Sequence, residues 1–320
     1  MKTAIVYDRV NKWGGAERVL LALHEIFPDA PLYTSVYNPK TASWAKVFRQ
    51  IIPSFLQKLP YAADHHEHFA YLMPLAFESF NFNEYDLVIS VTSEAAKGII
   101  TKPSTKHVCY CLTPTRYLWS HYEIYFKGAS FKGITRPIIS YLRNWDRIAA
   151  QRPDVLVAIS SVVKNRIANF YNRNSKIISP PVDLELFILP SKSHTSLIRM
   201  SEVKKGFYLV VSRLVSYKKV DLAVQAFNKL GLPLVIVGTG NEEQRLKKMA
   251  RRNVKFVGQL TDVALADYYK KCIALIMPQE EDFGIVALEA QAAGKPVIAY
   301  KAGGALDTVI DRKTGIFFDN

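Results

Sequence analysis

The first half of the chain alternates between short apolar runs and longer amphipathic stretches. Amphipathic stretches with helical spacing include Ala16–Ile26 and Val162–Phe170. Because strand–helix alternation produces parallel sheets with helices on both faces, this half predicts a doubly wound α/β domain. The runs with the length and continuous hydrophobicity of buried strands are Ala4–Tyr7, Asp86–Ser90, His107–Cys111 and Val155–Ile159.

The same alternation starts again in the second half. Helical segments such as Val220–Asn228 and Asn241–Ala250 separate five further apolar runs. We therefore expect a second doubly wound domain with its own parallel sheet. The five runs are Tyr208–Ser212, Leu234–Val237, Val254–Val257, Ala274–Met277 and Pro296–Tyr300.

A polar segment divides the two series. Pro180 and Pro181 stop the last run of the first half, and residues 189–205 are polar and show no periodicity, which is typical of a linker. We expect an N-terminal Rossmann-like domain over residues 1–186, a linker over 187–206 and a C-terminal Rossmann-like domain over 207–320.

The composition is that of a globular protein with a substantial core. Hydrophobic residues make up 49% of the chain and the mean hydropathy is +0.01, which excludes a disordered chain. The net charge of +14 indicates an anionic partner. This charge is spread over both halves without a basic tail, which argues against nucleic acid as the partner.

The remaining composition bears on location and cofactors. Three cysteines cannot build a disulfide framework, so we expect a reducing, cytoplasmic setting. No run has the length and charge of a signal peptide or a membrane span, so any membrane contact is expected to be peripheral.

His65, His66 and His68 lie near Glu67, but their spacing does not place two ligands on one helix face. We expect neither a metal nor a cofactor.

Ligands of open parallel sheets bind beyond the carboxyl ends of the strands, so the strand-to-helix junctions are the candidate sites. Gly14 and Gly15 open the helix after the first strand, where glycines allow close backbone approach and the helix N-terminus favours an anion. A flexible loop explains these glycines equally well. They do not form the spaced three-glycine fingerprint, and no ribose-binding acid follows, which argues against an NAD-dependent oxidoreductase.

Two junctions of the second half add charge and glycine. Arg213 carries a planar fork suited to a diphosphate, and Lys218 adds a point charge for the same group. A solvated basic loop is the alternative. Gly238, after the next strand, permits close approach of a ligand, although a tight turn accounts for it as well.

The segment from Glu281 to Glu289 is the strongest candidate. The helix N-terminus near Gly284 offers free N–H groups to phosphate or sugar oxygens. Phe283 and Ile285 flank Gly284 in the sequence. Glu281 precedes this terminus, where its carboxylate can accept hydrogen bonds from sugar hydroxyls, and Glu289 could reach a ribose. The alternatives are a carboxylate stabilised by the helix dipole at Glu281 and a solvated helix face at Glu289.

Together these junctions resemble the retaining family 4 glycosyltransferases of the GT-B fold. Gly14-Gly15-Ala16-Glu17 resembles the N-terminal glycine loop of that family, and Arg213 with Lys218 resembles its diphosphate-binding pair. Glu281 and Glu289, with Phe283, Gly284 and Ile285 between them, resemble its paired glutamates. The resemblance implies two Rossmann-like domains facing a cleft. It also implies that a nucleotide-sugar donor binds the C-terminal domain and that Glu281, Arg213 and Lys218 have catalytic roles.

Within that family the chain is similar to bacterial mannosyltransferases of polysaccharide and lipopolysaccharide assembly, on residues 109–122 and 281–284. The resemblance implies GDP-mannose, rather than a UDP-sugar, as the donor. It implies a lipid-linked oligosaccharide or polysaccharide acceptor, met peripherally at the inner face of the cytoplasmic membrane.

The chain departs from the family pattern in two places. The family usually carries a histidine that contacts the transferred sugar where this chain has Leu112, so we expect an altered rate or sugar choice. Family members also continue into a helix that crosses back to the first domain, and this sequence stops before it. A non-catalytic nucleotide-sugar or lipid-binding protein of the same fold is therefore the alternative function.

One segment predicts contact with the acceptor or an anionic membrane. Residues 44–59 combine basic side chains with apolar residues close to one helical face, and we expect Pro53 to interrupt this face and start a second helix. The pattern is typical of an interfacial helix. An ordinary packed surface helix is the alternative. The candidate residues of this segment are Phe48, Arg49, Ile52, Phe55 and Lys58.

Overall fold

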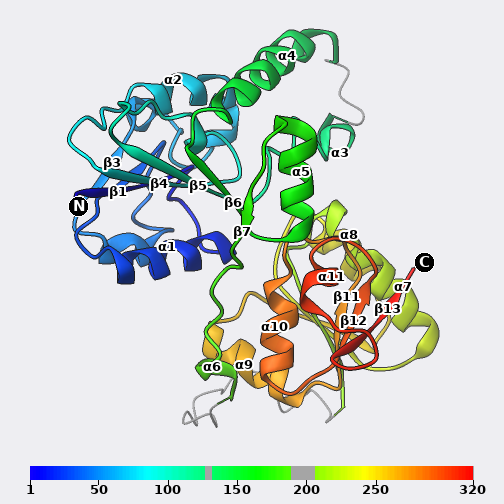
Figure 1. The fold of residues 1–320 in the computed structure, drawn as a ribbon. Helices are drawn as coiled ribbons and strands as arrows, with labels where there is room; N and C mark the ends of the chain where they lie inside the picture. Colours follow the sequence, from blue (N-terminus) through cyan, green and yellow to red (C-terminus); the bar gives the residue numbers. More distant parts are fainter. Residues whose placement is uncertain (127–131, 189–205, 320) are drawn as a thin grey trace. The chain divides into compact units, whose positions relative to one another are not determined.

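The strands of both halves are built from consecutive buried residues, as parallel strands covered on both faces must be. All five residues of β1 (Thr3–Tyr7) and all four of β9 (Leu234–Val237) are buried. Helices begin and end where the local sequence permits. Ser160, for example, caps α5 (Ser161–Tyr171), and Asn172 ends it in the left-handed conformation. The computed structural model describes residues 1–126, 132–188 and 206–319 (Figure 1).

The chain divides into a first unit, Met1–Pro181, and a second unit, Val182–Asn320. The expected linker over 187–206 lies mostly outside the described residues, and Phe187 is buried in the core of the second unit. The remaining α-helices and strands of the first unit are α1 (Gly15–Ile26), β2 (Leu32–Thr34), β3 (Ile51–Pro53), α2 (Met73–Glu78), β4 (Leu87–Thr92), β5 (Lys106–Cys111), α3 (Tyr122–Phe126), α4 (Lys132–Ala149), β6 (Val155–Ala158) and β7 (Lys176–Ile177).

The second unit repeats the alternation of strand and helix. Figure 1 labels its helices and its strands β11, β12 and β13. The elements besides β9 are α6 (Glu185–Ile188), β8 (Tyr208–Val211), α7 (Val220–Leu230), α8 (Glu243–Met249), β10 (Val254–Gly258), α9 (Asp262–Lys271), β11 (Leu275–Met277), α10 (Ile285–Ala292), β12 (Val297–Tyr300), α11 (Ala305–Thr308) and β13 (Gly315–Phe318).

Both sheets are parallel and share one strand order, which the first sheet extends by the additional edge strand β7. Among the described residues, the first sheet runs β3-β2-β1-β4-β5-β6-β7 and the second β10-β9-β8-β11-β12-β13. In each case the order reverses beside the first strand of the unit, between β1 and β4 and between β8 and β11. Ligands of doubly wound sheets bind at this reversal, beyond the carboxyl ends of the strands. The expected α/β fold with two doubly wound domains is confirmed.

Each sheet separates two apolar clusters. In the first unit, Val6 and Phe77 belong to one buried cluster, while Ile5 and Leu20 belong to another. Adjacent strand residues point to opposite faces, so neighbours in β1 join different clusters. The second unit repeats this arrangement. Each unit therefore has its own core and its own strand edge at which a ligand can bind.

The expected amphipathic helix over residues 44–59 is wrong. Short 3-10 helices at Ser43–Val47 and Phe55–Lys58 flank strand β3, which pairs with β2. Pro53 lacks an amide N–H and is tolerated because β3 is the edge strand of the sheet. No continuous helical face therefore exists in this segment to lie on a membrane.

The five candidate residues of this segment consequently have separate environments. Phe48 is only 4% exposed and packs in the core, and Ile52 is half-buried within β3. Arg49 is exposed and pairs with Asp29 at 2.5 Å. Phe55 and Lys58 are exposed in the second 3-10 helix. Phe48 and Ile52 thus serve the fold, whereas Phe55 is an exposed apolar residue outside any continuous helical face.

A buried histidine makes the stability of the first unit sensitive to acid. His107 in β5 is fully buried, and its Nε2 lies 2.8 Å from the hydroxyl of Ser90. Burial lowers the pKa of His107 to about 3, and the charge of Arg152 adds to this, while Asp154 opposes it. The folded protein therefore holds this imidazole neutral, whereas the unfolded chain protonates it below about pH 6.5.

We expect the free energy of unfolding to fall as the pH drops from about 6.5 towards 3. The loss from this one group approaches about 1.4 kcal/mol per pH unit, because the unfolded state binds the extra proton. Urea unfolding at several pH values measures the slope for the natural chain and for His107→Gln. An equal slope between pH 6.5 and 5 in the two proteins would contradict the prediction.

Candidate functional site

The carboxyl edge of the second sheet brings Lys218 and Glu281 together. Lys218 ends a 3-10 helix after β8, and Glu281 follows β11, the neighbouring strand at the reversal. The Lys218 ammonium nitrogen lies 2.5 Å from each carboxylate oxygen of Glu281. The two side chains are only 9% and 16% exposed. A partly desolvated pair of this kind is stronger than a surface pair and holds both charges at the strand edge.

Arg213 joins this cluster through an aromatic ring. The guanidinium of Arg213 is exposed, and its Nη2 donates a hydrogen bond to the Tyr217 hydroxyl at 2.5 Å. The Tyr217 ring centre lies 6.0 Å from the Arg213 guanidinium carbon and 5.5 Å from Lys218 Nζ. Tyr217 therefore gathers two cations beside one carboxylate, an arrangement that suits a diphosphate carrying a hydroxylated group. No sequence pattern singles out Tyr217.

Gln279 was also missed. Its side-chain amide donates a hydrogen bond to Glu281 Oε1 at 2.6 Å, and the residue is buried. No spacing or motif marks this glutamine, although it lies directly after a buried strand. The Glu281 carboxylate is thus held by a cation and by an amide.

Gly238 positions the loop that carries Arg213. Its backbone has φ = 129°, and a Cβ atom at this position would lie 1.9 Å from the carbonyl oxygen of Ser212. The following turn is bonded to the same loop, since Leu214 N donates to Thr239 O at 2.9 Å. The close backbone approach expected at Gly238 is therefore made to the Arg213 loop.

Replacing Gly238 by alanine is expected to lower the free energy of unfolding by at least about 2 kcal/mol, because it adds both backbone strain and a clash. Thermal and urea unfolding measure the loss. Gly231→Ala is the matched control, since Gly231 also has a positive φ but its Cβ would meet no atom within 4 Å. Equal losses of unfolding free energy in the two variants would mean that the close contact with Ser212 does not contribute to the effect.

The junction after β12 packs against the glutamate segment. Gly303 forms a parallel bridge with Glu281, and Gly304 N donates to the Glu281 carbonyl at 2.7 Å. A Cβ atom on Gly304 would lie 2.4 Å from the Cα of Phe283. These glycines therefore fix the backbone from which the Glu281 side chain extends.

The other predicted residues of this segment lie at the start of α10. Gly284, with φ = 87°, precedes its first residue, Ile285, and Phe283 is buried. Glu289 is buried as well, and its Oε2 accepts a hydrogen bond from the Tyr269 hydroxyl at 2.8 Å. The alternative of a solvated face at Glu289 is therefore wrong, because this carboxylate is bonded within the second unit.

In the first unit, Gly14 and Gly15 lead into α1. Gly14 lies at the N-cap, where a Cβ would come within 3.1 Å of Glu17 Oε2, whereas a Cβ on Gly15 would meet no atom within 4 Å. Glu17 is buried and accepts a hydrogen bond from the Tyr7 hydroxyl at 2.8 Å. Burial raises the pKa of the Glu17 carboxyl, and the bond from Tyr7 opposes this effect. The glycine turn thus lies beside a buried acid.

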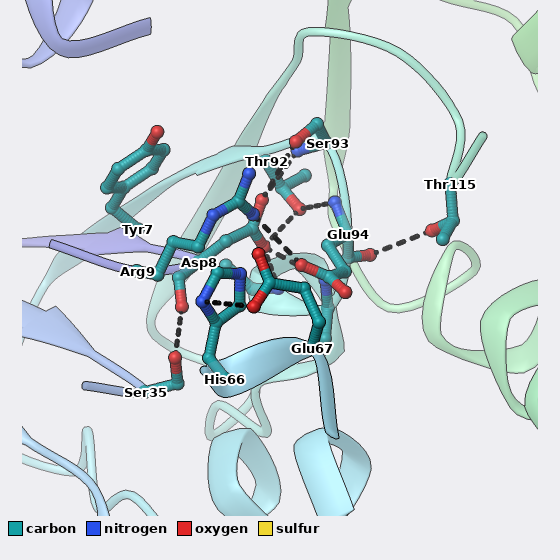
Figure 2. Close-up of polar contacts among 12 residues, drawn as sticks. Tyr7, Asp8, Arg9, Ser35, His66, Glu67, Thr92, Ser93, Glu94 and Thr115 are labelled. Carbon is teal, nitrogen blue, oxygen red and sulfur yellow. Dashed lines mark hydrogen bonds and ion pairs between the residues drawn. The ribbon is translucent and has the colours of Figure 1, made fainter. Parts of the chain in front are cut away.

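A second polar cluster occupies the reversal of the first sheet. Figure 2 shows side chains that meet there from the end of β1, from a 3-10 helix at His66–Leu72 and from the end of β4 and the loop after it, with Ser35 and Thr115 beside them. The Asp8 carboxylate accepts hydrogen bonds from Thr92 Oγ1 at 2.8 Å and from the amide of Ser93 at 2.7 Å. Asp8 therefore ties the ends of the two central strands together.

Arg9 and Glu94 form an ion pair beside this anchor. Arg9 Nη1 lies 3.0 Å from Glu94 Oε2, and the Tyr117 hydroxyl donates to Glu94 Oε1 at 3.1 Å. Burial raises the pKa of the Glu94 carboxyl, while the Arg9 guanidinium opposes this. No motif marks either residue in the sequence, although each follows a predicted buried strand closely.

His66, which the sequence does not predict as a metal ligand, belongs to this cluster. Its Nδ1 accepts a hydrogen bond from the Asn11 amide at 3.0 Å and lies 3.4 Å from Glu67 Oε2 (Figure 2). Burial lowers the pKa of His66 to about 2, and the charges of Arg9 and Lys12 add to this, so the ring is neutral. Within residues 1–126, 132–188 and 206–319, no group of three or more His, Cys, Asp or Glu side chains could hold a metal ion.

Leu112 follows β5 and is half-buried against an apolar cluster of the first unit. Its amide donates to the carbonyl of Thr92 at 2.8 Å, so its backbone extends the pairing of β4 and β5.

None of the described helices has both the length and the apolar character needed to span a lipid bilayer.

Sequence comparisons match the second unit to one family. The family of glycosyl transferases group 1 matches residues 198–320. A GDP-mannose-dependent alpha-(1-6)-phosphatidylinositol monomannoside mannosyltransferase of Mycobacterium tuberculosis is 31% identical over 187 residues, which are 52% of this chain and 49% of that protein. Sulfoquinovosyl transferase SQD2 of Arabidopsis thaliana is 28% identical over 210 residues, 62% of this chain and 41% of that protein. The chain spans about half the length of the curated relatives it matches.

The fold has solved counterparts. HepE of Anabaena, crystallised with UDP-glucose, aligns with a TM-score of 0.71 and 20% identity over 99% of this chain and 85% of its own. At this identity the likeness bears on the fold alone. Both units therefore have the fold of the GT-B glycosyltransferases, and residues 198–320 match the group 1 glycosyl transferases.

Proposed function

We propose that the protein is a retaining glycosyltransferase that moves a sugar from a nucleotide-sugar donor to a lipid-linked or polysaccharide acceptor. The observation that carries this proposal is the Lys218–Glu281 pair at the reversal of the second sheet, with Arg213 gathered beside it on Tyr217. Cations at this edge suit the diphosphate of a donor, and a carboxylate beside them suits its sugar hydroxyls.

The chemical step follows from these groups. The bond between the sugar C1 and the diphosphate oxygen breaks, and its electron pair goes to the diphosphate. The acceptor hydroxyl oxygen bonds to C1 on the same face, and its proton passes to the departing diphosphate. Arg213 and Lys218 stabilise the charge that develops on the leaving group, so they act more strongly on the transition state than on the ground state.

We propose GDP-mannose as the donor. The M. tuberculosis relative, whose name states GDP-mannose dependence, supports this choice. The sulfoquinovosyl transferase, a relative of similar identity, transfers a different group and so argues for other donors. Donor choice is therefore the first quantity to measure.

We propose that the first unit binds the acceptor and that the protein works peripherally at the inner face of the cytoplasmic membrane. The relative that acts on a phosphatidylinositol monomannoside, together with the net positive charge, supports a lipid-linked acceptor and an anionic surface. Arg9 and Glu94 lie where the first sheet can offer a donor and an acceptor of hydrogen bonds to sugar hydroxyls.

The proposal is tested with a panel of GDP- and UDP-sugars. For each donor, hydrolysis and transfer are assayed, and binding is measured by calorimetry. We expect turnover with GDP-mannose, measured as release of GDP, and slower turnover with UDP-glucose. Binding without turnover of any donor would favour the non-catalytic nucleotide-sugar-binding protein. Absence of both binding and turnover would overturn the proposal. Co-sedimentation with vesicles of rising anionic lipid content tests the membrane contact, and binding that ignores lipid charge would contradict it.

A further inference from the structure

Gln279 is a buried amide with only one satisfied end. It follows Pro278 after β11 and is 2% exposed. Its Nε2 donates to Glu281 Oε1 at 2.6 Å, whereas its buried Oε1 accepts no hydrogen bond from the described residues. Buried polar atoms are almost always paired, so an unpaired one requires a reason.

The carboxylate of Glu281 supplies that reason. An ionised carboxylate only accepts hydrogen bonds, so the amide must turn its N–H towards Glu281 and leave its oxygen facing the protein interior. The opposite orientation would bring two acceptors together. The packing of Gln279 is therefore arranged around its bond to Glu281.

The other bonds of Glu281 indicate what this amide does. Lys218 reaches both oxygens at 2.5 Å, and Gln279 reaches Oε1 alone. A diphosphate bound at Lys218 competes with Glu281 for the same ammonium group. If Lys218 turns towards that diphosphate, the hydrogen bond from Gln279 still orients the carboxylate.

We propose that Gln279 is a positioning residue that keeps the Glu281 carboxylate in place when the donor diphosphate engages Lys218. This inference rests on the proposed function and adds a residue to its donor site. Gln279 acts through Glu281 and contacts no reacting atom. Its loss should therefore affect turnover more than nucleotide binding.

Gln279→Met keeps the size of the side chain and removes its N–H. We expect kcat for donor turnover to fall about tenfold, the effect of losing one hydrogen bond to a charged group, while Kd for GDP and UDP changes less than about twofold. Gln291→Met is the matched control, because Gln291 also donates one amide hydrogen bond in the second unit, to the Thr308 carbonyl at 2.8 Å. The control should retain the natural kcat.

Gln279→Glu separates positioning from packing. Near neutral pH its new carboxylate repels Glu281, but on acidification the protonated acid can donate to Glu281 as the amide did. We expect the kcat of this variant, relative to the natural protein, to rise as the pH falls, while that of Gln279→Met stays constant. Equal pH profiles for the two variants, or losses of nucleotide affinity as large as the losses of kcat, would overturn the proposal.

A binding-independent measurement keeps the inference testable if no donor turns over. Urea unfolding of Gln279→Met, Glu281→Met and the double variant forms a thermodynamic cycle. A coupling between the two substitutions supports the contact even if the proposed function fails. Strictly additive effects overturn the positioning role even if the protein proves to be a glycosyltransferase.

Discussion

Lys218→Met is expected to lower the rate of glycosyl transfer about 100- to 1,000-fold, the usual effect of removing one group that stabilises transition-state charge. The ammonium is nearly buried and sits at the strand edge beside Arg213 and Glu281. Methionine fills the same space without a charge, so under the proposed function only the Arg213 cation would remain for the departing diphosphate. Steady-state kinetics with the best donor of the panel measures the change in kcat and in kcat/KM.

The control for this variant is Lys229→Met. Lys229 is an exposed lysine in the last turn of α7, and its replacement removes one charge from the same unit. Its transfer rate should stay within about twofold of the natural rate, as expected for a surface substitution. Circular dichroism and thermal melting must show that Lys218→Met remains folded. A folded Lys218→Met protein with undiminished transfer would end the assignment of this site.

Asp146→Ala is expected to destabilise the first unit by about 3–5 kcal/mol, the usual effect of breaking a buried ion pair. Asp146 in α4 and Lys97 are each 1% exposed and lie 2.5 Å apart. The carboxylate also accepts hydrogen bonds from Trp119 Nε1 at 2.7 Å and the Tyr171 hydroxyl at 2.8 Å. Alanine leaves the Lys97 ammonium buried without its counter-ion. Urea unfolding followed by circular dichroism measures the loss.

The exposed pair Lys106–Asp154 provides the comparison. Its charged atoms lie 3.2 Å apart on side chains that are about half exposed. Lys106→Ala should therefore change the free energy of unfolding by less than about 1 kcal/mol. The double variant Lys97→Met/Asp146→Leu should recover part of the stability lost in Asp146→Ala, because it removes both charges. An unfolding free energy for Asp146→Ala close to that for Lys106→Ala would contradict the role of the buried pair.

Much of the fold could be predicted because the long strands are continuous apolar runs. The runs Ala4–Tyr7 and Leu234–Val237 correspond to β1 and β9 almost residue for residue. The strands that escaped prediction are short or lie at an edge. β3 has three residues and ends on a proline, and both residues of β7 are exposed. Two or three residues do not establish a period of two, so the segment at β3 was interpreted as a helix.

The sequence predicted individual residues of the site better than the contacts between them. Lys218 and Glu281 were each found at a strand end, but 63 residues separate them. Their direct pairing depends on β8 and β11 being neighbours, and strand order follows from packing that periodicity does not describe. Gln279 and Tyr217 carry no motif, because a single amide or a single phenol leaves no repeated spacing in the sequence.

The pairing of Lys218 with Glu281 has a consequence for selectivity. A small oxyanion without hydroxyl groups, such as sulfate, would compete for the ammonium group of Lys218 and offer the Glu281 carboxylate no donor in exchange. A molecule that carries both a polyanionic group and a polyol offers a partner to Lys218 and to Glu281 at the same time. Under the proposed function, the contact between Lys218 and Glu281 would therefore disfavour ligands that satisfy only one of the two side chains.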